Sequence, residues 1–242
     1  MAGISAAQLV RVWECGQGTD ATGKALILLS AAHPEIPAEE LRSLSIGRRD
    51  ASLVRFRREL FGAAARAFAE CPRCLSRLEY EAPAAEMLEP DSPDFHEPLT
   101  LEWEGWSVRF RLINSGDVAA ASACRTIAEA RRMLASRCIV EAHGGGAAVS
   151  EDIPESVIER ISERLGQADP NADLSIALTC LGCGHGWEVV FDVAAFLWAE
   201  VSALAKRLMR EVDVLARAYH WREADILAMS WVRRQFYMEM AG

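Results

Sequence analysis

Apolar residues recur every three or four positions through the first part of the chain, and this spacing predicts a series of helices. Residues 23–33 form a compact apolar segment that ends before Pro34, and residues 37–44 begin with proline and acidic residues, as helices commonly do. From 49 to 71 the helical spacing continues, so we expect a helix that leads directly into the first cysteine pair. Its apolar series comprises Leu53, Phe56, Leu60, Phe61, Ala64 and Phe68.

The middle of the chain mixes alternating and helical patterns. Residues 77–83 alternate like a strand, and residues 86–98, which are rich in proline and acid, predict an exposed loop. Residues 99–113 predict a hairpin that turns at Glu104 and Gly105. Further elements follow in order: a helix at 114–136, a strand at 138–143, a flexible connection at 143–152, a helix at 154–169, and strands at 172–180 and 186–192.

The last part of the chain predicts one long helix and two short ones. Residues 193–219 carry a wide apolar stripe, so we expect this helix to bury more than one side. The short helices are expected at 221–230 and 231–240. The stripe consists of Leu197, Val201, Leu204, Leu208, Val212, Leu215 and Tyr219.

Two Cys-x-x-Cys pairs stand more than a hundred residues apart, at Cys71 and Cys74 and at Cys180 and Cys183. Four thiolates hold zinc tetrahedrally in closed structural sites, and a gap of two residues lets one turn supply two of them. Strand-like residues follow each pair, as in a zinc ribbon. We therefore predict a structural Zn²⁺ bound by all four cysteines. The alternatives are four buried free thiols, a redox pair, or a site in which His185 replaces one cysteine.

The distance between the pairs implies an insertion whose two ends the metal ties together. Closing a long loop in this way should give a large entropic gain. We therefore expect an α+β protein with a mostly helical body, a split four-cysteine zinc ribbon and an inserted lobe of strands and helices. The predicted parts are residues 1–77, with the first knuckle; 78–179, the inserted acidic lobe; and 180–242, with the second knuckle and the C-terminal helices.

Composition and charge fit a globular protein of the cell interior. Apolar residues make up 51% of the 242 positions and charged residues 25%. No secretory signal or apolar run of membrane-spanning length is visible, so we expect a cytoplasmic protein with no membrane partner. In that reducing setting Cys15, Cys124 and Cys138 are expected to be buried free thiols. The net charge is −9, and residues 78–179 carry 8 basic and 19 acidic residues.

Nothing in the sequence predicts catalysis. The histidines are scattered, and the glycines at 144–146 lack the lysine and the strand-to-helix context of a phosphate-binding loop. A closed four-cysteine site also leaves no open coordination position for a substrate. We therefore expect a non-catalytic protein with no small-molecule substrate.

Three segments, residues 41–62, 180–201 and 205–240, resemble the baseplate and tail-assembly proteins of contractile phages and phage-tail-like injection systems, a group related to the T-even baseplate hub proteins. The acidic middle of the chain contributes little to this resemblance. The resemblance implies a structural or assembly role in which the partners are baseplate or tail proteins, and it allows incorporation into a phage-tail-like particle.

The C-terminal segment has the composition of an interface. Aromatic and arginine side chains are enriched at the centres of protein interfaces. We therefore expect residues 219–240 to dock a partner, although about half of these side chains should pack into the protein's own core. The candidate partner-binding residues are Tyr219, Trp221, Trp231, Arg233 and Arg234.

A zinc-ribbon regulator that binds nucleic acid is the alternative function. An arginine set on or near one predicted helix favours it: Arg48, Arg49, Arg55, Arg57 and Arg58. The negative net charge and the acidic residues near the knuckles disfavour it, because phosphate-binding ribbons are usually basic around the metal. These acidic residues are Glu70, Glu79, Glu81 and Glu188.

Overall fold

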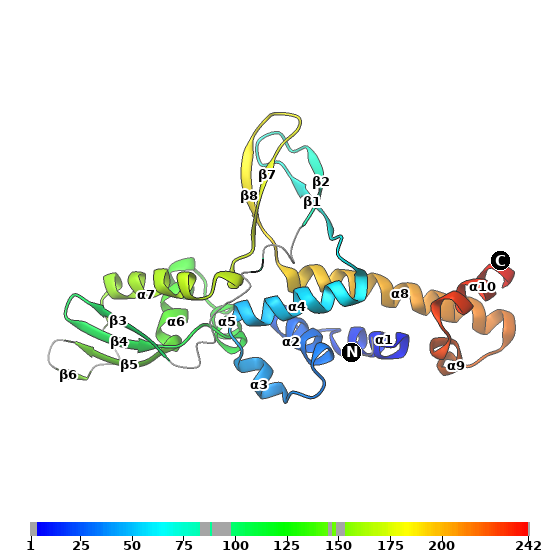
Figure 1. Ribbon diagram of the computed structural model, residues 1–242, viewed down its shortest axis with the longest axis horizontal. Helices are drawn as coiled ribbons and strands as arrows, with labels where there is room; N and C mark the ends of the chain where they lie inside the picture. Colours follow the sequence, from blue (N-terminus) through cyan, green and yellow to red (C-terminus); the bar gives the residue numbers. More distant parts are fainter. Residues whose placement is uncertain (1–3, 83–87, 89–97, 145–146, 149–152, 242) are drawn as a thin grey trace.

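The computed structural model describes residues 4–82, 88, 98–144, 147–148 and 153–241. It consists of an elongated helical body, an α+β lobe at one end, and a stalk of two β-hairpins that rises from the middle (Figure 1). The predicted α+β class, with a mostly helical body and an inserted mixed lobe, is confirmed. Most of the predicted loop at 86–98 and of the predicted connection at 143–152 lies outside the described residues.

The helical body combines the two ends of the chain. Helices from the first sixty residues pack against the long C-terminal helix, and two short helices fold back onto the far end of that helix (Figure 1). The helices of the body are α1 (Ala6–Cys15), α2 (Ala21–Ala32), α3 (Ala38–Ser43), α4 (Ile46–Phe61), α8 (Val193–Tyr219), α9 (Glu223–Ala228) and α10 (Trp231–Ala241).

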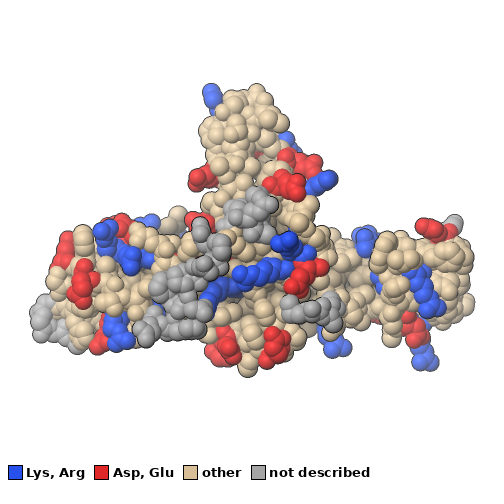
Figure 2. All heavy atoms as spheres, in the orientation of Figure 1, with Lys and Arg blue, Asp and Glu red and all other residues tan. Residues whose placement is uncertain are grey.

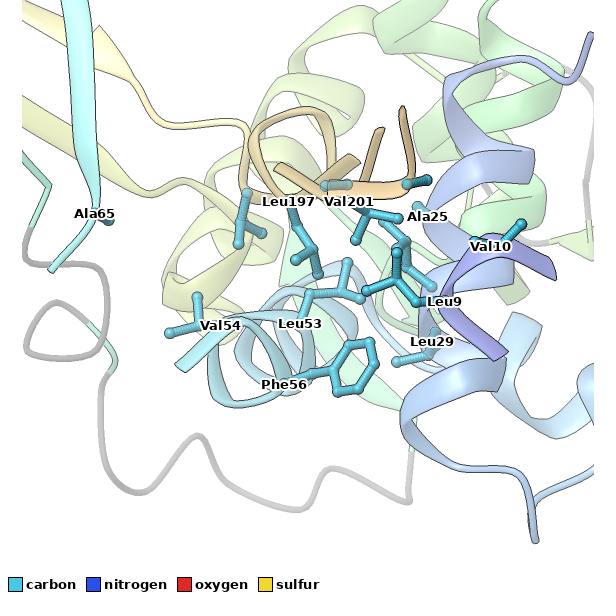
Figure 3. Packing of buried hydrophobic residues seen from close by; sticks show 14 of the residues in the cluster. Leu9, Val10, Ala25, Leu29, Leu53, Val54, Phe56, Ala65, Leu197 and Val201 are labelled. Atoms are coloured by element: carbon cyan, nitrogen blue, oxygen red, sulfur yellow. The ribbon is translucent and has the colours of Figure 1, made fainter. Parts of the chain in front are cut away.

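One apolar core joins these helices. Leu53 of α4 and Leu197 of α8 are fully buried and point into the same interior, together with Leu29 of α2 and Leu9 of α1 (Figure 3). Burying a leucine side chain stabilises the fold by roughly 1.5–3 kcal/mol. The contributing helices come from both ends of the chain. The core therefore forms only when the middle of the chain lies outside it and lets the two ends meet.

The predicted helix at 49–71 is wrong in its second half. Helix α4 ends at Phe61, and Gly62 follows with a φ of 85°, a conformation that is costly for other residues. Arg57 then donates hydrogen bonds to the carbonyls of Gly62 (2.8 Å) and Ala64 (2.7 Å), which fixes the chain as it leaves the helix. The residues before Cys71 form a strand instead.

The stalk contains two separate antiparallel hairpins. Strands β1 (Arg66–Glu70) and β2 (Arg77–Glu81) form the first, and β7 (Ser175–Thr179) and β8 (Gly186–Val190) form the second. The hairpins rise side by side from the body (Figure 1). Each is a sheet of only two strands, and an isolated hairpin of this kind is marginally stable in water.

The lobe has its own smaller core. Val108 and Phe110 of the central strand are fully buried against Ile158 and Ile161, which lie on a covering helix. The sheet order is β3-β4-β5-β6. The lobe contains β3 (Leu99–Trp103), β4 (Trp106–Phe110), α5 (Ser115–Ala121), α6 (Ile127–Cys138), β5 (Ile139–Gly144), β6 (Ala147–Ala148), α7 (Glu155–Ala168) and the short 3₁₀ helix η1 (Pro170–Ala172).

One predicted helix of the lobe, at 114–136, is two helices. Helix α5 ends at Ala121, and α6 starts afresh after Thr126. The Thr126 hydroxyl accepts a hydrogen bond from the Glu129 N–H, and the Glu129 carboxylate accepts one from the Thr126 N–H. This capping box is a helix start signal, and it outweighs the continuous apolar spacing.

The lobe joins the body at the N-terminus of α4. The Ile46 N–H donates to the Ile113 carbonyl (3.0 Å), and the Gly47 N–H donates to Asp169 Oδ2 (2.9 Å). A Cβ at position 47 would lie 2.0 Å from Asp169 Oδ1, so only glycine fits here. Burial raises the pKa of Asp169, and the helix N–H partly offsets this effect.

Candidate metal centre

The first knuckle is a tight turn at the tip of the β1–β2 hairpin. The Leu75 N–H donates to the Cys71 carbonyl (2.9 Å), and the Cys71 N–H donates to the Ser76 carbonyl (3.0 Å). Leu75 has a φ of 61°, which lies in the left-handed region. The turn therefore closes at the fourth residue after Cys71, and it places Cys71 and Cys74 on the same side.

The second knuckle repeats this geometry at the tip of the β7–β8 hairpin. The Gly184 N–H donates to the Cys180 carbonyl (2.9 Å), and the Cys180 N–H donates to the His185 carbonyl (2.9 Å). Gly184 takes the left-handed conformation (φ 69°) that Leu75 takes in the first turn. The two hairpins thus present their cysteines in the same way, as the two halves of a zinc ribbon do.

The four sulfur atoms meet between the two tips. The Sγ atoms of Cys71 and Cys183 lie 3.7 Å apart, and those of Cys74 and Cys180 lie 3.5 Å apart. All four lie within 4.8 Å of one another. Each of these two short contacts joins one hairpin to the other, so the cluster ties the tips together.

These distances fit a metal ion better than disulfides. A disulfide requires sulfurs about 2.05 Å apart. A tetrahedral ion with metal–sulfur bonds of about 2.3 Å places its ligands about 3.8 Å apart. The contacts of 3.5 and 3.7 Å match the edge of such a tetrahedron. The four cysteines could therefore hold a metal ion, as the sequence predicted.

Local hydrogen bonds make the thiols unequal. Contacts with the side chain and the backbone of Ser76 lower the pKa of Cys74 to about 6. For Cys183, the His185 N–H favours the thiolate, but desolvation and the neighbouring thiols raise the pKa to about 12. Cys71 and Cys180 are almost fully buried, whereas Cys74 is exposed. Binding of a metal to all four thiolates must therefore release protons.

The other cysteines and His185 lie outside the cluster. The His185 ring stacks on Trp187 with centroids 6.1 Å apart, and it does not belong to the group that could hold a metal. The expectation that the remaining cysteines are buried holds only for Cys138. Cys15 is exposed and Cys124 is half-buried; the sequence gives no signal for this difference, because exposure depends on tertiary packing.

Most of the candidate partner-binding residues pack within the protein. The rings of Tyr219 and Trp221 stack with centroids 4.6 Å apart, and both contact Tyr237. These side chains are half-buried. Arg233 is exposed and lies over the Tyr237 ring, and Trp231 is 67% exposed.

Arg234 does not lie where the sequence predicted. Its expected position at an exposed docking surface is wrong, because the side chain is buried and its Nε donates to Glu211 Oε2 at 2.9 Å. Sequence reasoning also missed Arg207 and Arg210 of α8, which line a groove together with Trp231. Their helical spacing from Glu211 and Val214 is visible in the sequence, but nothing there shows that α10 folds back beside them.

Comparison with family models, with curated proteins and with solved structures finds no match to this chain. Within the part of the chain that the structure describes, no helix combines the length and the apolar character needed to span a membrane.

Proposed function

We propose that Cys71, Cys74, Cys180 and Cys183 hold a structural Zn²⁺ ion. Two features support this assignment: the four-thiol ligand set and its near-tetrahedral spacing. Zinc with four cysteine ligands has no open position for substrate, so the ion acts as a clip rather than as a catalyst. It stabilises two hairpins that each lack a core of their own.

Metal analysis of the purified protein tests this assignment. We expect about one zinc per chain when no chelator is used. The double variant Cys74→Ser, Cys180→Ser should lose the metal, because it leaves one ligand on each hairpin. Cys15→Ser is the matched control, since Cys15 is an exposed thiol outside the cluster. Wild-type protein without metal, or a double variant that keeps its zinc, would refute the assignment.

We further propose that the protein is a non-catalytic structural or assembly component of a contractile tail-like particle. The resemblance of residues 41–62, 180–201 and 205–240 to baseplate and tail-assembly proteins supports this function. The elongated form, with a lobe, a stalk and a C-terminal helical end, offers separate surfaces for several protein partners (Figure 1). We place the protein in the cytoplasm of the producing cell or in the particle itself.

The charge of the stalk favours protein partners over nucleic acid. Figure 2 shows mostly uncharged side chains on the outer half of the stalk. The hairpins carry basic and acidic residues in similar numbers, whereas a phosphate-binding surface needs a clear basic excess. The basic residues are Arg66, Arg73 and Arg77, and the acidic residues are Glu70, Glu79, Glu81 and Glu188.

Particle assembly in producing cells tests the proposed function. Deleting the gene should abolish or arrest tail-like particles, as seen by electron microscopy, and the wild-type gene should restore them. The zinc-site double variant should restore them poorly, whereas Cys15→Ser should restore them fully. Normal, active particles in the deletion strain would refute the function.

A further inference from the structure

Helices α8 and α10 lie together at the end of the molecule opposite the lobe (Figure 1). Side chains of these two helices line a groove there. It encloses about 380 Å³. Arg207, Arg210 and Val214 line it from α8, and Trp231 and Met238 line it from α10. The lining residues span two turns on each helix, so the groove has the length of a short helical contact.

The exposed charge of the groove is positive. Glu211 lies on its floor, but this carboxylate is buried and accepts hydrogen bonds from Arg234 (2.9 Å) and Gln235 (3.0 Å). Arg207 contacts the same carboxylate at 3.5 Å and keeps most of its side chain exposed. Arg210 is exposed and forms no ion pair with any described residue. The one acidic side chain that lines the groove is thus buried against Arg234 and Arg207, whereas Arg207 and Arg210 are exposed, so the exposed charge of the groove is positive.

The apolar part of the groove comes from Trp231. Its side chain is 67% exposed, although tryptophan is a residue type that usually buries much of its surface. Val214 and Met238 are half-buried beside it. A tryptophan next to arginines is the composition that characterises the energetic centres of protein interfaces.

We propose that this groove receives an acidic amphipathic helix of a partner protein. The partner's apolar side chains pack on Trp231, Val214 and Met238, and its carboxylates pair with Arg207 and Arg210. A helix suits the site because two packed helices form the sides of the groove, and a third helix can pack between them. The proposal rests on the assembly function proposed above, and it names the chemistry of the partner.

The surroundings of the groove disfavour nucleic acid. A phosphate-binding surface gathers basic residues with few acidic ones among them. The exposed charges on residues 203–241 are mixed: Lys206, Arg207, Arg210, Arg217, Arg222 and Arg233 are basic, and Asp213, Glu223, Asp225 and Glu239 are acidic.

A display library measures the preference of the groove directly. The library presents amphipathic peptides of about 16 residues, which form helices of roughly 24 Å. Leucine is fixed on one face, and Glu, Gln or Lys varies at the flanking positions. Selection on the full-length protein should enrich Glu at the flanks, and the binding of a selected peptide should weaken as salt rises. Enrichment of Lys, or no enrichment, would overturn the proposal.

Matched variants locate the binding surface. Trp231→Ala and Arg210→Glu should each weaken a selected peptide by about ten-fold or more. The controls are Phe236→Ala, an aromatic residue of α10 that is 59% exposed and does not line the groove, and Arg217→Ala, an exposed arginine further along α8. Arg210→Glu keeps the test decisive if Trp231→Ala fails to fold. If Phe236→Ala loses binding and Trp231→Ala keeps it, the peptide binds the surface around Phe236 and the groove is not the binding site.

Particle assembly separates this proposal from the proposed function. If gene deletion blocks assembly but Trp231→Ala and Arg210→Glu restore it fully, the groove proposal fails and the assembly function stands. If deletion leaves assembly intact, the assembly function fails whatever the peptides show. Two further results would refute the acidic helix as the occupant of the groove. One is binding of single-stranded DNA instead of the acidic peptides, and the other is concentration-dependent self-association that Trp231→Ala abolishes.

Discussion

The Arg234 guanidinium of α10 lies against the Glu211 carboxylate of α8, with Nε 2.9 Å from Oε2, and both side chains are about 95% buried. Arg234 also donates to the Met229 carbonyl at 2.6 Å, where the chain turns from α9 into α10. The pair therefore fixes the returning helix on the long one. It also sets the shape of the groove that we propose as the docking site.

Replacing Arg234 by alanine should lower the free energy of unfolding by about 2–4 kcal/mol, because Glu211 would be left buried with weaker partners. Urea denaturation measures the loss. Arg233→Ala is the matched control on the same helix. Among the described residues, the exposed Arg233 side chain contacts the Tyr237 ring through a cation–π interaction, so its removal should cost less than about 1 kcal/mol. Equal effects of the two substitutions would contradict this account.

A buried carboxylate in the lobe should make the free energy of unfolding depend on pH in the acidic range. Asp117 is fully buried and accepts hydrogen bonds from Arg111 (2.6 and 2.9 Å) and Arg137 (2.9 Å). Burial alone would raise the pKa of Asp117, but the two arginines and the Asn114 N–H lower it below the usual 3.8. The stabilisation is therefore complete above about pH 4 and is lost as the pH falls through the lowered pKa.

The variant Asp117→Asn should be less stable than the wild type by about 2–3 kcal/mol at pH 7, because it loses charged hydrogen bonds in a buried place. The difference should shrink as the pH drops below 3.8, since the wild type then loses the same charge. Thermal unfolding between pH 2.5 and 7 measures it. Asp213→Asn, on an exposed pair with Arg217, should change stability little. A difference independent of pH would contradict the role of the charge.

The residue that takes the left-handed conformation is Leu75 in the first knuckle and Gly184 in the second. Leu75 holds a left-handed conformation that costs a non-glycine residue about 1–2 kcal/mol. Leu75→Gly removes this cost. It also increases the conformational entropy of the unfolded chain, which lowers the stability of the fold by roughly 0.5–1 kcal/mol. We expect a net gain of about 0.5–1 kcal/mol, measured by hydrogen exchange in the first hairpin. Gly184→Leu, the reverse change in the second knuckle, should destabilise its hairpin; stabilisation there would contradict the argument.

Removing the metal should loosen the stalk and spare the body. The hairpins form two separate sheets, whereas six of the body helices (α1, α2, α3, α4, α8 and α9) contribute buried residues to one core. After chelation, hydrogen exchange should speed up in β1, β2, β7 and β8, and the helical circular dichroism should stay nearly constant. A large loss of helical signal would mean that the clip also holds the body together.

Local signals in the sequence determined much of this structure. The helix predicted at 193–219 matches α8, because its apolar stripe is long and Asp192 caps its start. The hairpin turn at Glu104 and Gly105 matches as well, and both residues have positive φ. The pairing of two distant Cys-x-x-Cys motifs was predictable, because a single pair cannot satisfy a tetrahedral ion. Each of these features depends on neighbouring residues or on ligand chemistry.

Tertiary structure alone decided the rest. Residues 66–70 fit a helical pattern, and they become a strand because β2 supplies its hydrogen-bond partners after the knuckle turns the chain back. Arg234 is buried because α10 returns to Glu211, which lies 23 residues earlier in the chain. The same return creates the groove between Arg210 and Trp231. Periodicity records which side of a helix is apolar, but which element comes to lie against it depends on contacts between residues distant in the sequence.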